Sequence, residues 1–153
     1  MAAAVQILVD ADACPVKDEV YKVAWRHGVP VKVVSNSPMR VPDHPLVERI
    51  MVSDRFDAAD DWIAEAAGAG TVVITGDILL ADRCLKAGAT VLAHNGKPFT
   101  AASIGGAIAT RAIMADLRAG ADGIMGGPKP FARTDRSRFL QALDEALVRL
   151  ERL

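Results

Sequence analysis

Five short apolar runs, separated by polar or turn-rich stretches, define the hydrophobic pattern of this chain. Three of the runs are almost continuously apolar and do not alternate between apolar and polar residues. Strands that are covered on both faces of a parallel sheet have this composition. The pattern therefore predicts five strands, at residues 5–9, 31–34, 47–52, 71–75 and 89–93.

Amphipathic segments lie between most of these strands and predict helices. The first helix is expected to carry Pro15 in its first turn and to end at Gly28. The second is expected to be capped by Asp57 and to run to about residue 67, with acidic residues in its first turn, where they suit the helix dipole. A third helix is predicted over residues 78–86.

The pattern changes after the fifth predicted strand. Thr100 is predicted to cap a long helix that reaches about residue 119, and residues 120–130 are rich in glycine and proline, as in a loop. A last amphipathic helix is predicted from about Asp135. Its buried face is expected to consist of Phe139, Leu143, Ala146, Leu147 and Leu150.

This alternation of strands and helices predicts an α/β fold: a three-layer sandwich around a mainly parallel sheet of about five strands, with right-handed crossovers. The chain contains no internal repeat and no long linker, so residues 1–153 are expected to form one domain. Residues 1–95 would be its α/β core, and residues 100–153 would form C-terminal helices joined by a basic, Gly/Pro-rich loop at 120–138.

Composition narrows the functional classes. The 153 residues are 51% hydrophobic and 24% charged, which excludes a disordered chain. Eighteen basic and nineteen acidic residues give a net charge of -1, so the protein is not a uniformly basic nucleic-acid coat. Two cysteines exclude a disulfide scaffold, and neither a signal peptide nor a membrane-length apolar run is visible. We therefore expect a soluble cytoplasmic protein.

Acidic residues follow three of the predicted strands, where open parallel sheets bind their ligands. Asp10 and Asp12 follow the first strand, Asp57 and Asp60 lie after the third, and Asp77 follows the fourth. Carboxylates a few Å apart repel one another by roughly 1–4 kcal/mol per pair at surface-like dielectric. An oxygen-preferring divalent cation, Mg²⁺ or Mn²⁺, would offset this repulsion, and no Cys/His cluster has zinc spacing.

Each of these acidic residues also has a purely structural interpretation. A single Asp after a strand usually caps a turn or a helix, and Asp57 is the clearest case. Asp77, behind Thr75 and a glycine, is intermediate. Asp10 and Asp12 are the hardest to explain in this way, because they interrupt the end of an apolar strand.

A second signal is a concentration of positive charge at residues 126–138. This segment contains Lys129, Arg133, Arg136 and Arg138 against the single acid Asp135. It would contact phosphates or, equally, form a turn and a solvated helix start. Further arginines outside it that would enlarge such a patch are Arg40, Arg111 and Arg118.

Several of these segments together resemble the YaiI/YqxD family of bacterial proteins, in order and over nearly the whole chain. The segments are Asp10-Ala-Asp12-Ala-Cys14-Pro15, the Asn36 region, Arg40-Val-Pro, Phe56-Asp57-Ala-Ala-Asp60, Val73-Ile-Thr75-Gly-Asp77-Ile and the run from Gly126 to Phe139. That family is placed among PIN-like (NYN-type) domains, whose better-known members are metal-dependent ribonucleases. The resemblance implies acidic site positions at Asp10, Asp12, Asp57, Asp60 and Asp77, with Asn36 and Thr75 nearby. Leu79, where many relatives have proline, departs from the pattern.

The first hypothesis is therefore a Mg²⁺- or Mn²⁺-dependent phosphodiesterase that acts on RNA, single-stranded in the first instance. Asp10, Asp60 and Asp77 would bind metal directly, and Asp12 and Asp57 would be further ligands or orient metal-bound water. The catalytic residues would be Asp10, Asp12, Asp60 and Asp77. The residues expected to bind substrate are Asn36, Thr75, Arg40, Lys129, Arg133 and Arg136.

Two alternatives remain open. A phosphatase of the haloacid-dehalogenase type would use Asp10 and Asp12, but it needs a lysine between its second and last motifs, and residues 37–76 contain none. A PIN-like module that binds RNA or protein without cutting is the other. The sequence leaves the oligomeric state open.

Overall fold

The computed structural model describes residues 4–12, 14–55, 57–121 and 131–152, with the backbone alone for residues 115–121. Within this part of the chain the sheet has six strands in the order β3-β2-β1-β4-β5-β6. The strands are β1 (Gln6–Asp10), β2 (Val31–Ser35), β3 (Val47–Met51), β4 (Thr71–Ile74), β5 (Thr90–Leu92) and β6 (Pro98–Phe99). The helices are α1 (Lys17–His27), α2 (Ala58–Ala66), α3 (Ile78–Lys86), α4 (Ala101–Ala121) and α5 (Arg133–Glu151).

The predicted mainly parallel sheet is confirmed. Strands β1 to β5 pair in parallel, and the two-residue strand β6 runs antiparallel to β5. Strand β6 was not predicted, because two residues are too few for a period-two pattern to be visible. All five predicted strands are present, with ends that differ by one or two residues.

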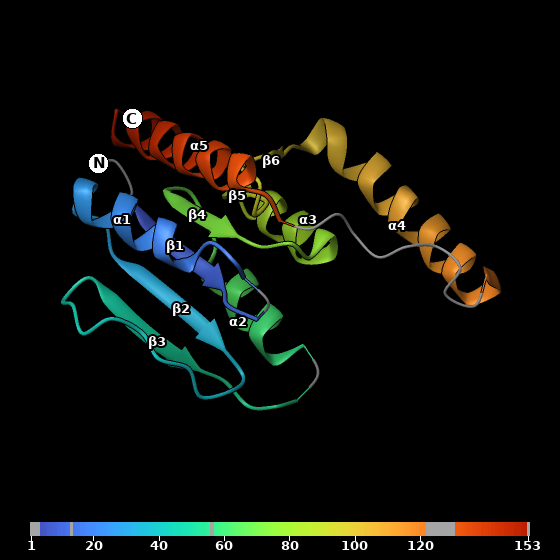
Figure 1. Cartoon of the computed structure of the whole chain (residues 1–153), viewed down its shortest axis with the longest axis horizontal. Helices are drawn as coiled ribbons and strands as arrows, with labels where there is room; N and C mark the ends of the chain where they lie inside the picture. Colours follow the sequence, from blue (N-terminus) through green and yellow to red (C-terminus); the bar gives the residue numbers. More distant parts are fainter. Residues whose placement is uncertain (1–3, 13, 56, 122–130, 153) are drawn as a thin grey trace.

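Helices cover both faces of the sheet, as Figure 1 shows, which confirms the three-layer α/β sandwich. Helices α1 and α5 pack on one face, and α2 and α3 pack on the other. Helix α4 packs against α3 through the buried Ile104 and the partly buried Ile108, and then extends beyond the sheet (Figure 1). No helix of the described chain has the length and apolarity needed to cross a bilayer.

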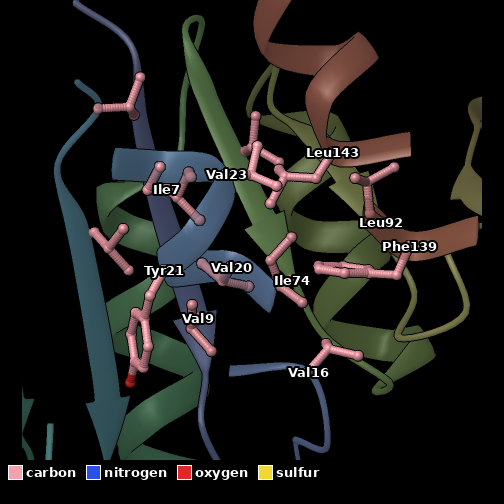
Figure 2. Packing of buried hydrophobic residues seen from close by; sticks show 14 of the residues in the cluster. Ile7, Val9, Val16, Val20, Tyr21, Val23, Ile74, Leu92, Phe139 and Leu143 are labelled. Atoms are coloured by element: carbon pink, nitrogen blue, oxygen red, sulfur yellow. The ribbon is translucent and has the colours of Figure 1, made fainter. Parts of the chain in front are cut away.

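Successive residues of the central strand β1 enter opposite cores, because strand side chains alternate between the two faces of a sheet. Ile7 and Val9 join the core beneath α1 and α5, where Figure 2 shows them packed with Val20 and Phe139. Leu8 joins the core beneath α2 and α3. These three of the five side chains of β1 are fully buried, and each such burial contributes about 1.5–3 kcal/mol.

Several helix ends differ from the prediction. Helix α1 begins at Lys17, so Pro15 precedes the helix and does not lie in its first turn. Helix α5 begins at Arg133, two residues before Asp135, because the Asp135 carboxylate accepts a hydrogen bond from the Ala132 N–H at 2.9 Å and caps the helix from its third position. Thr100 is confirmed as a cap: its hydroxyl accepts the Ser103 N–H at 3.1 Å.

Helix α5 follows the rest of the prediction. The side chains that it buries are Phe139, Leu143, Ala146 and Leu147, and Leu150 packs against them while partly buried. Helix α4 ends at Ala121, close to the predicted residue 119. The Gly/Pro-rich segment 122–130 lies outside the described residues.

Polar contacts join α1 and α5 at both ends of their interface. At one end, His27 Nε2 lies 2.7 Å from Asp144 and His27 Nδ1 lies 3.2 Å from Glu151. At the other, Arg136 donates to Glu19 Oε1 at 3.0 Å and to the Pro15 carbonyl at 2.6 Å. These contacts set the position of α5 along α1.

We predict that the contribution of His27 to stability depends on pH. The hydrogen bond to Asp144, together with Glu151, raises the pKa of His27 against the opposing effect of its burial. The folded state therefore favours the protonated ring, and this stabilisation is fully present below the unfolded pKa and lost as pH rises through the folded pKa. Because both acids are more than a third exposed, the effect is expected to be at most about 1 kcal/mol.

Urea unfolding of wild type and His27→Gln at about pH 5.5 and about pH 8.5 measures this dependence. The variant should lose stability relative to wild type at the lower pH, and much less at the higher pH. An equal loss at both values would show that His27 acts by packing and not by charge.

Candidate functional site

The candidate site lies at the carboxyl edge of the sheet, between β1 and β4, where the order in which strands are added reverses. From β1 the chain moves to β2 and β3 on one side, and then returns to β4 and β5 on the other. Ligands bind at such a switch point in open α/β sheets, because the connecting loops diverge there. Asp10 ends β1, and Thr75, Gly76 and Asp77 directly follow β4, so two of the predicted acidic segments meet at this point.

A buried threonine links these two segments. The Thr75 hydroxyl donates to Asp10 Oδ2 at 2.8 Å and accepts the Asp77 N–H at 3.0 Å. Thr75 itself is fully buried, so water does not compete for either bond. One side chain therefore fixes both the orientation of the Asp10 carboxylate and the start of the loop that carries Asp77.

Asp77 has a structural role as well as a place in the cluster. Its Oδ1 accepts hydrogen bonds from the N–H groups of Leu79 at 2.9 Å and Leu80 at 3.2 Å, which makes it the N-cap of α3. The structural interpretation of Asp77 is thus confirmed. Within the described chain Oδ2 makes no hydrogen bond, so this second oxygen is available for a ligand.

Asp57 does not cap α2 with its side chain, contrary to the prediction. It precedes the helix in the left-handed region with φ of 70°, and its carboxylate makes no capping hydrogen bond. Its carbonyl instead accepts the Asp61 N–H at 2.8 Å. Aspartate tolerates this backbone conformation better than most residues, and the side chain is left exposed at the edge of the site.

The electrostatics of the cluster favour protonation of its most buried member. Burial raises the pKa of Asp10 to about 6; the hydrogen bond from Thr75 lowers it, and the charges of Asp60, Asp12 and Asp77 raise it further. The pKa of Asp60 is also raised, by burial and then by Asp77 and Asp57, while Arg83 lowers it. These side chains therefore act on one another across the sheet edge as the sequence predicted.

Two adjoining clefts open over this cluster. The larger, of about 700 Å³, includes Asn36 from the end of β2 and Asp57 and Asp60 from the start of α2. The smaller, of about 510 Å³, extends towards Gly76 and His94. The residues that line both clefts are Asp10, Asp12, Asp77 and Arg111.

The expected substrate-binding residues are divided between this site and other places. Asn36 lines the larger cleft, and Thr75 lies buried beneath Asp10. Arg40, on the segment between β2 and β3, instead lines a separate hollow together with Arg49 of β3. Arg133, the first residue of α5, is exposed and lines neither cleft.

Arg136, a further member of the predicted basic segment, lines neither cleft. Arg136 is held by Glu19 and the Pro15 carbonyl, and its guanidinium lies 5.0 Å from the centre of the Phe131 ring. Its charge thus serves the α1–α5 interface. Lys129 lies outside the described residues.

Sequence reasoning missed Arg55 and Arg83, two of the three described arginines that line the larger cleft. Arg55 and Arg83 both pair with Asp61, at 3.5 and 3.0 Å, so Asp61 holds two arginines at the edge of the site. Arg111 from α4 lines both clefts, although the sequence associated it with the basic segment that follows α4. No local pattern could have found these residues, because their placement depends on how α2, α3 and α4 pack.

His94 was visible in the sequence as the residue that follows the fifth strand, but it had no assigned role. Its Nε2 is buried, and within the described residues it has no hydrogen-bond partner. Burial and then the charge of Lys17 lower the pKa of His94, so both favour the neutral ring. A Cβ on Gly76 would lie 3.2 Å from His94 Cε1, a tight contact that the imidazole ring would have to relieve by a small shift.

The donor types of the cleft suit a hard cation, since they are carboxylate and amide oxygens. A preformed metal site also requires that at least three ligating side chains lie close together. In the part of the chain that the structure describes, no three His, Cys, Asp or Glu side chains are grouped closely enough to hold a metal ion. The cleft therefore has the donor types expected for Mg²⁺ or Mn²⁺, but its described side chains are not grouped as a metal site.

We predict that Thr75→Val will raise the pKa of Asp10 above about 6, because the hydrogen bond that favours the charged carboxylate is removed. The same change leaves the Asp77 N–H without its acceptor and should lower the free energy of unfolding by about 1–3 kcal/mol. Carboxyl-carbon NMR titration and urea unfolding measure the two effects. Thr75→Ser, which keeps the hydroxyl, is the control, and an unchanged Asp10 pKa in Thr75→Val would contradict the assignment.

Comparison with known proteins agrees with the resemblance read from the motifs. Residues 8–149 match the sequence model of the uncharacterised bacterial YaiI/YqxD family. A UPF0178 protein of Sphingopyxis alaskensis is 76% identical over 146 residues, which cover 95% of each chain. A UPF0178 protein of Jannaschia sp. is 61% identical over 146 residues, covering 95% of this chain and 94% of that one, and one of Nitrobacter winogradskyi is 60% identical over 149 residues, covering 97% and 94%. No solved structure matches the chain. The chain belongs to the YaiI/YqxD family.

Proposed function

We propose that this protein is a metal-dependent nuclease that hydrolyses phosphodiester bonds in single-stranded RNA. The observation that carries the proposal is the convergence of carboxylates from three separate segments on one cleft at the carboxyl edge of the sheet. These carboxylates are Asp10, Asp12, Asp57, Asp60 and Asp77. The choice of RNA follows from the resemblance to PIN-like domains, whose better-known members are ribonucleases.

The electrostatic cost of the cluster supports a functional role. Burial, and then the charges of the neighbouring carboxylates, raise the pKa of Asp10 to about 6. A structural aspartate has no need of such a position, whereas a bound divalent cation would offset both the desolvation and the repulsion. Oxygen-only donors favour Mg²⁺ or Mn²⁺ for this purpose.

The role proposed for each residue combines the sequence-based hypothesis with its place in the cleft lining. Asp10, Asp60 and the free oxygen of Asp77 would hold the cation, with Asp12 and Asp57 as further ligands or as acceptors that orient a water molecule. When bound, the cation supplies activation of water and stabilisation of charge on the phosphate. Thr75 keeps the Asp10 carboxylate in one orientation from below. Asn36 is positioned to donate its amide to a substrate oxygen at the cleft edge.

The phosphatase alternative lacks its required cation in the described site. A haloacid-dehalogenase-type enzyme needs a lysine to neutralise the phosphate, and no lysine is among the described residues that line either cleft. We therefore expect that the protein does not hydrolyse p-nitrophenyl phosphate, a generic phosphatase substrate.

We predict that Asp10→Asn lowers the cleavage of labelled single-stranded RNA by at least about 100-fold in Mn²⁺ or Mg²⁺, a loss of about 3 kcal/mol in transition-state stabilisation. The change is nearly isosteric and removes a partly buried charge, so the fold should be retained. EDTA should abolish the cleavage by wild type. Asp54→Asn, which removes a carboxylate from the same cleft outside the proposed ligand set, is the matched control and should change the rate only slightly.

Full activity of Asp10→Asn, or cleavage in EDTA, would contradict the proposal. Retained RNA binding by the wild type with no cleavage in either metal would instead point to the non-catalytic binding module.

A further inference from the structure

Arg111 occupies the junction of the two clefts, at the middle of α4. It lines both of them together with Asp10, Asp12 and Asp77. Its side chain is exposed, and it makes no hydrogen bond or ion pair with any residue in the described part of the chain. A guanidinium group that borders several carboxylates without pairing with any of them is left available for an anion from outside.

The other two arginines of the larger cleft are used differently. Arg55 and Arg83 both form ion pairs with Asp61, which neutralises part of their charge and restricts their movement. Arg111 has no such partner. It is therefore the arginine of this cleft, as far as the structure describes it, whose five N–H donors are free.

The packing of α4 directs Arg111 towards the site. Ile104, Ile108 and Arg111 lie at positions i, i+4 and i+7, which share one face of an α-helix. Ile104 is buried and Ile108 partly buried in the core that includes α3, so this face is turned towards the body of the protein. Arg111 is also the one charged residue within residues 101–114 of α4.

An anionic substrate meets strong repulsion at this site. Among the described residues, six carboxylates and three guanidinium groups line the larger cleft. A phosphodiester that approaches the acidic cluster therefore needs a cation on its outer side, as well as any metal ion on its inner side. Arginine suits that position because its planar fork binds two phosphate oxygens at once.

We infer that Arg111 binds a phosphodiester group of the substrate at the junction of the two clefts, so that α4 forms a wall of the site. The inference rests on the proposed nucleic-acid substrate and assigns a residue for its recognition. The nucleotides on either side of the bound phosphate would then lie in the two clefts, one towards Asn36 and the other towards His94.

The test is binding of a fluorescent single-stranded RNA oligonucleotide, followed by anisotropy with Ca²⁺ in place of Mn²⁺ so that binding is observed without cleavage. Arg111→Ala should weaken binding by about tenfold and should reduce the slope of log K against log salt by about 0.7, the value for one lost phosphate contact on a single strand. Arg111→Lys keeps the charge and should retain the slope while it weakens binding less. Arg152→Ala, which removes a positive charge from the end of α5, is the control and should bind as wild type does.

A second measurement separates substrate recognition from a structural effect. Arg111→Ala should bind Mn²⁺, followed by electron paramagnetic resonance, at least as tightly as wild type, and its melting temperature should be unchanged. Weakened Mn²⁺ binding would overturn the inference in favour of a structural role for Arg111. RNA binding by Arg111→Ala equal to that of wild type, or an equal loss in Arg152→Ala, would also overturn it.

Cleavage assays on the same variants separate this inference from the proposed function. RNA binding that depends on Arg111 without any cleavage in Mn²⁺ would overturn the nuclease proposal and support the phosphate assignment. Cleavage by Arg111→Ala at the wild-type rate, with unchanged RNA binding, would support the nuclease proposal and overturn the phosphate assignment. Failure of the wild type to bind the RNA would overturn both.

Discussion

The candidate site depends on the register between the two central strands of the sheet. Val9 of β1 pairs with Ile74 of β4, so the next residues, Asp10 and Thr75, leave the sheet edge together and their side chains meet at 2.8 Å. Both strands are buried on both faces, and a slip of one residue would move every side chain to the opposite core. The apolar packing of β1 and β4 therefore holds the polar contact in place.

The same packing that fixes this register makes the site electrostatically costly. Burial around the end of β1 raises the pKa of Asp10, and Thr75 offsets only part of that effect. Two helix starts hold further carboxylates at this edge. Asp77 caps α3 through one oxygen, and Asp57 enters α2 from a left-handed conformation that keeps its carboxylate outside the helix. The protein thus keeps several carboxylates at one edge at a cost in stability, and a ligand of opposite charge would recover that cost.

The two C-terminal helices have different relations to this edge. Helix α5 belongs to the core: Phe139, Leu143 and Leu147 are fully buried, and Arg136 and His27 join α5 to α1. Helix α4 contacts the body mainly through α3, and Arg111, the one charged residue among residues 101–114, lies at the cleft. One helix therefore stabilises the fold, while the other adds a wall and a cation to the site.

The sequence by itself determined the five parallel strands, the five helices to within a few residues, and the sheet edge at which Asp10, Asp12, Asp60 and Asp77 lie. Those properties follow from local patterns, since apolar runs identify buried strands and topology places their ends together. Other features depended on the tertiary structure: the pairing of Arg136 with Glu19, the separation of Arg40 from the cleft, the hold of Asp61 on two arginines and the place of Arg111. A long charged side chain reaches several neighbours, and which one it meets is decided only when helices distant in sequence have packed against each other.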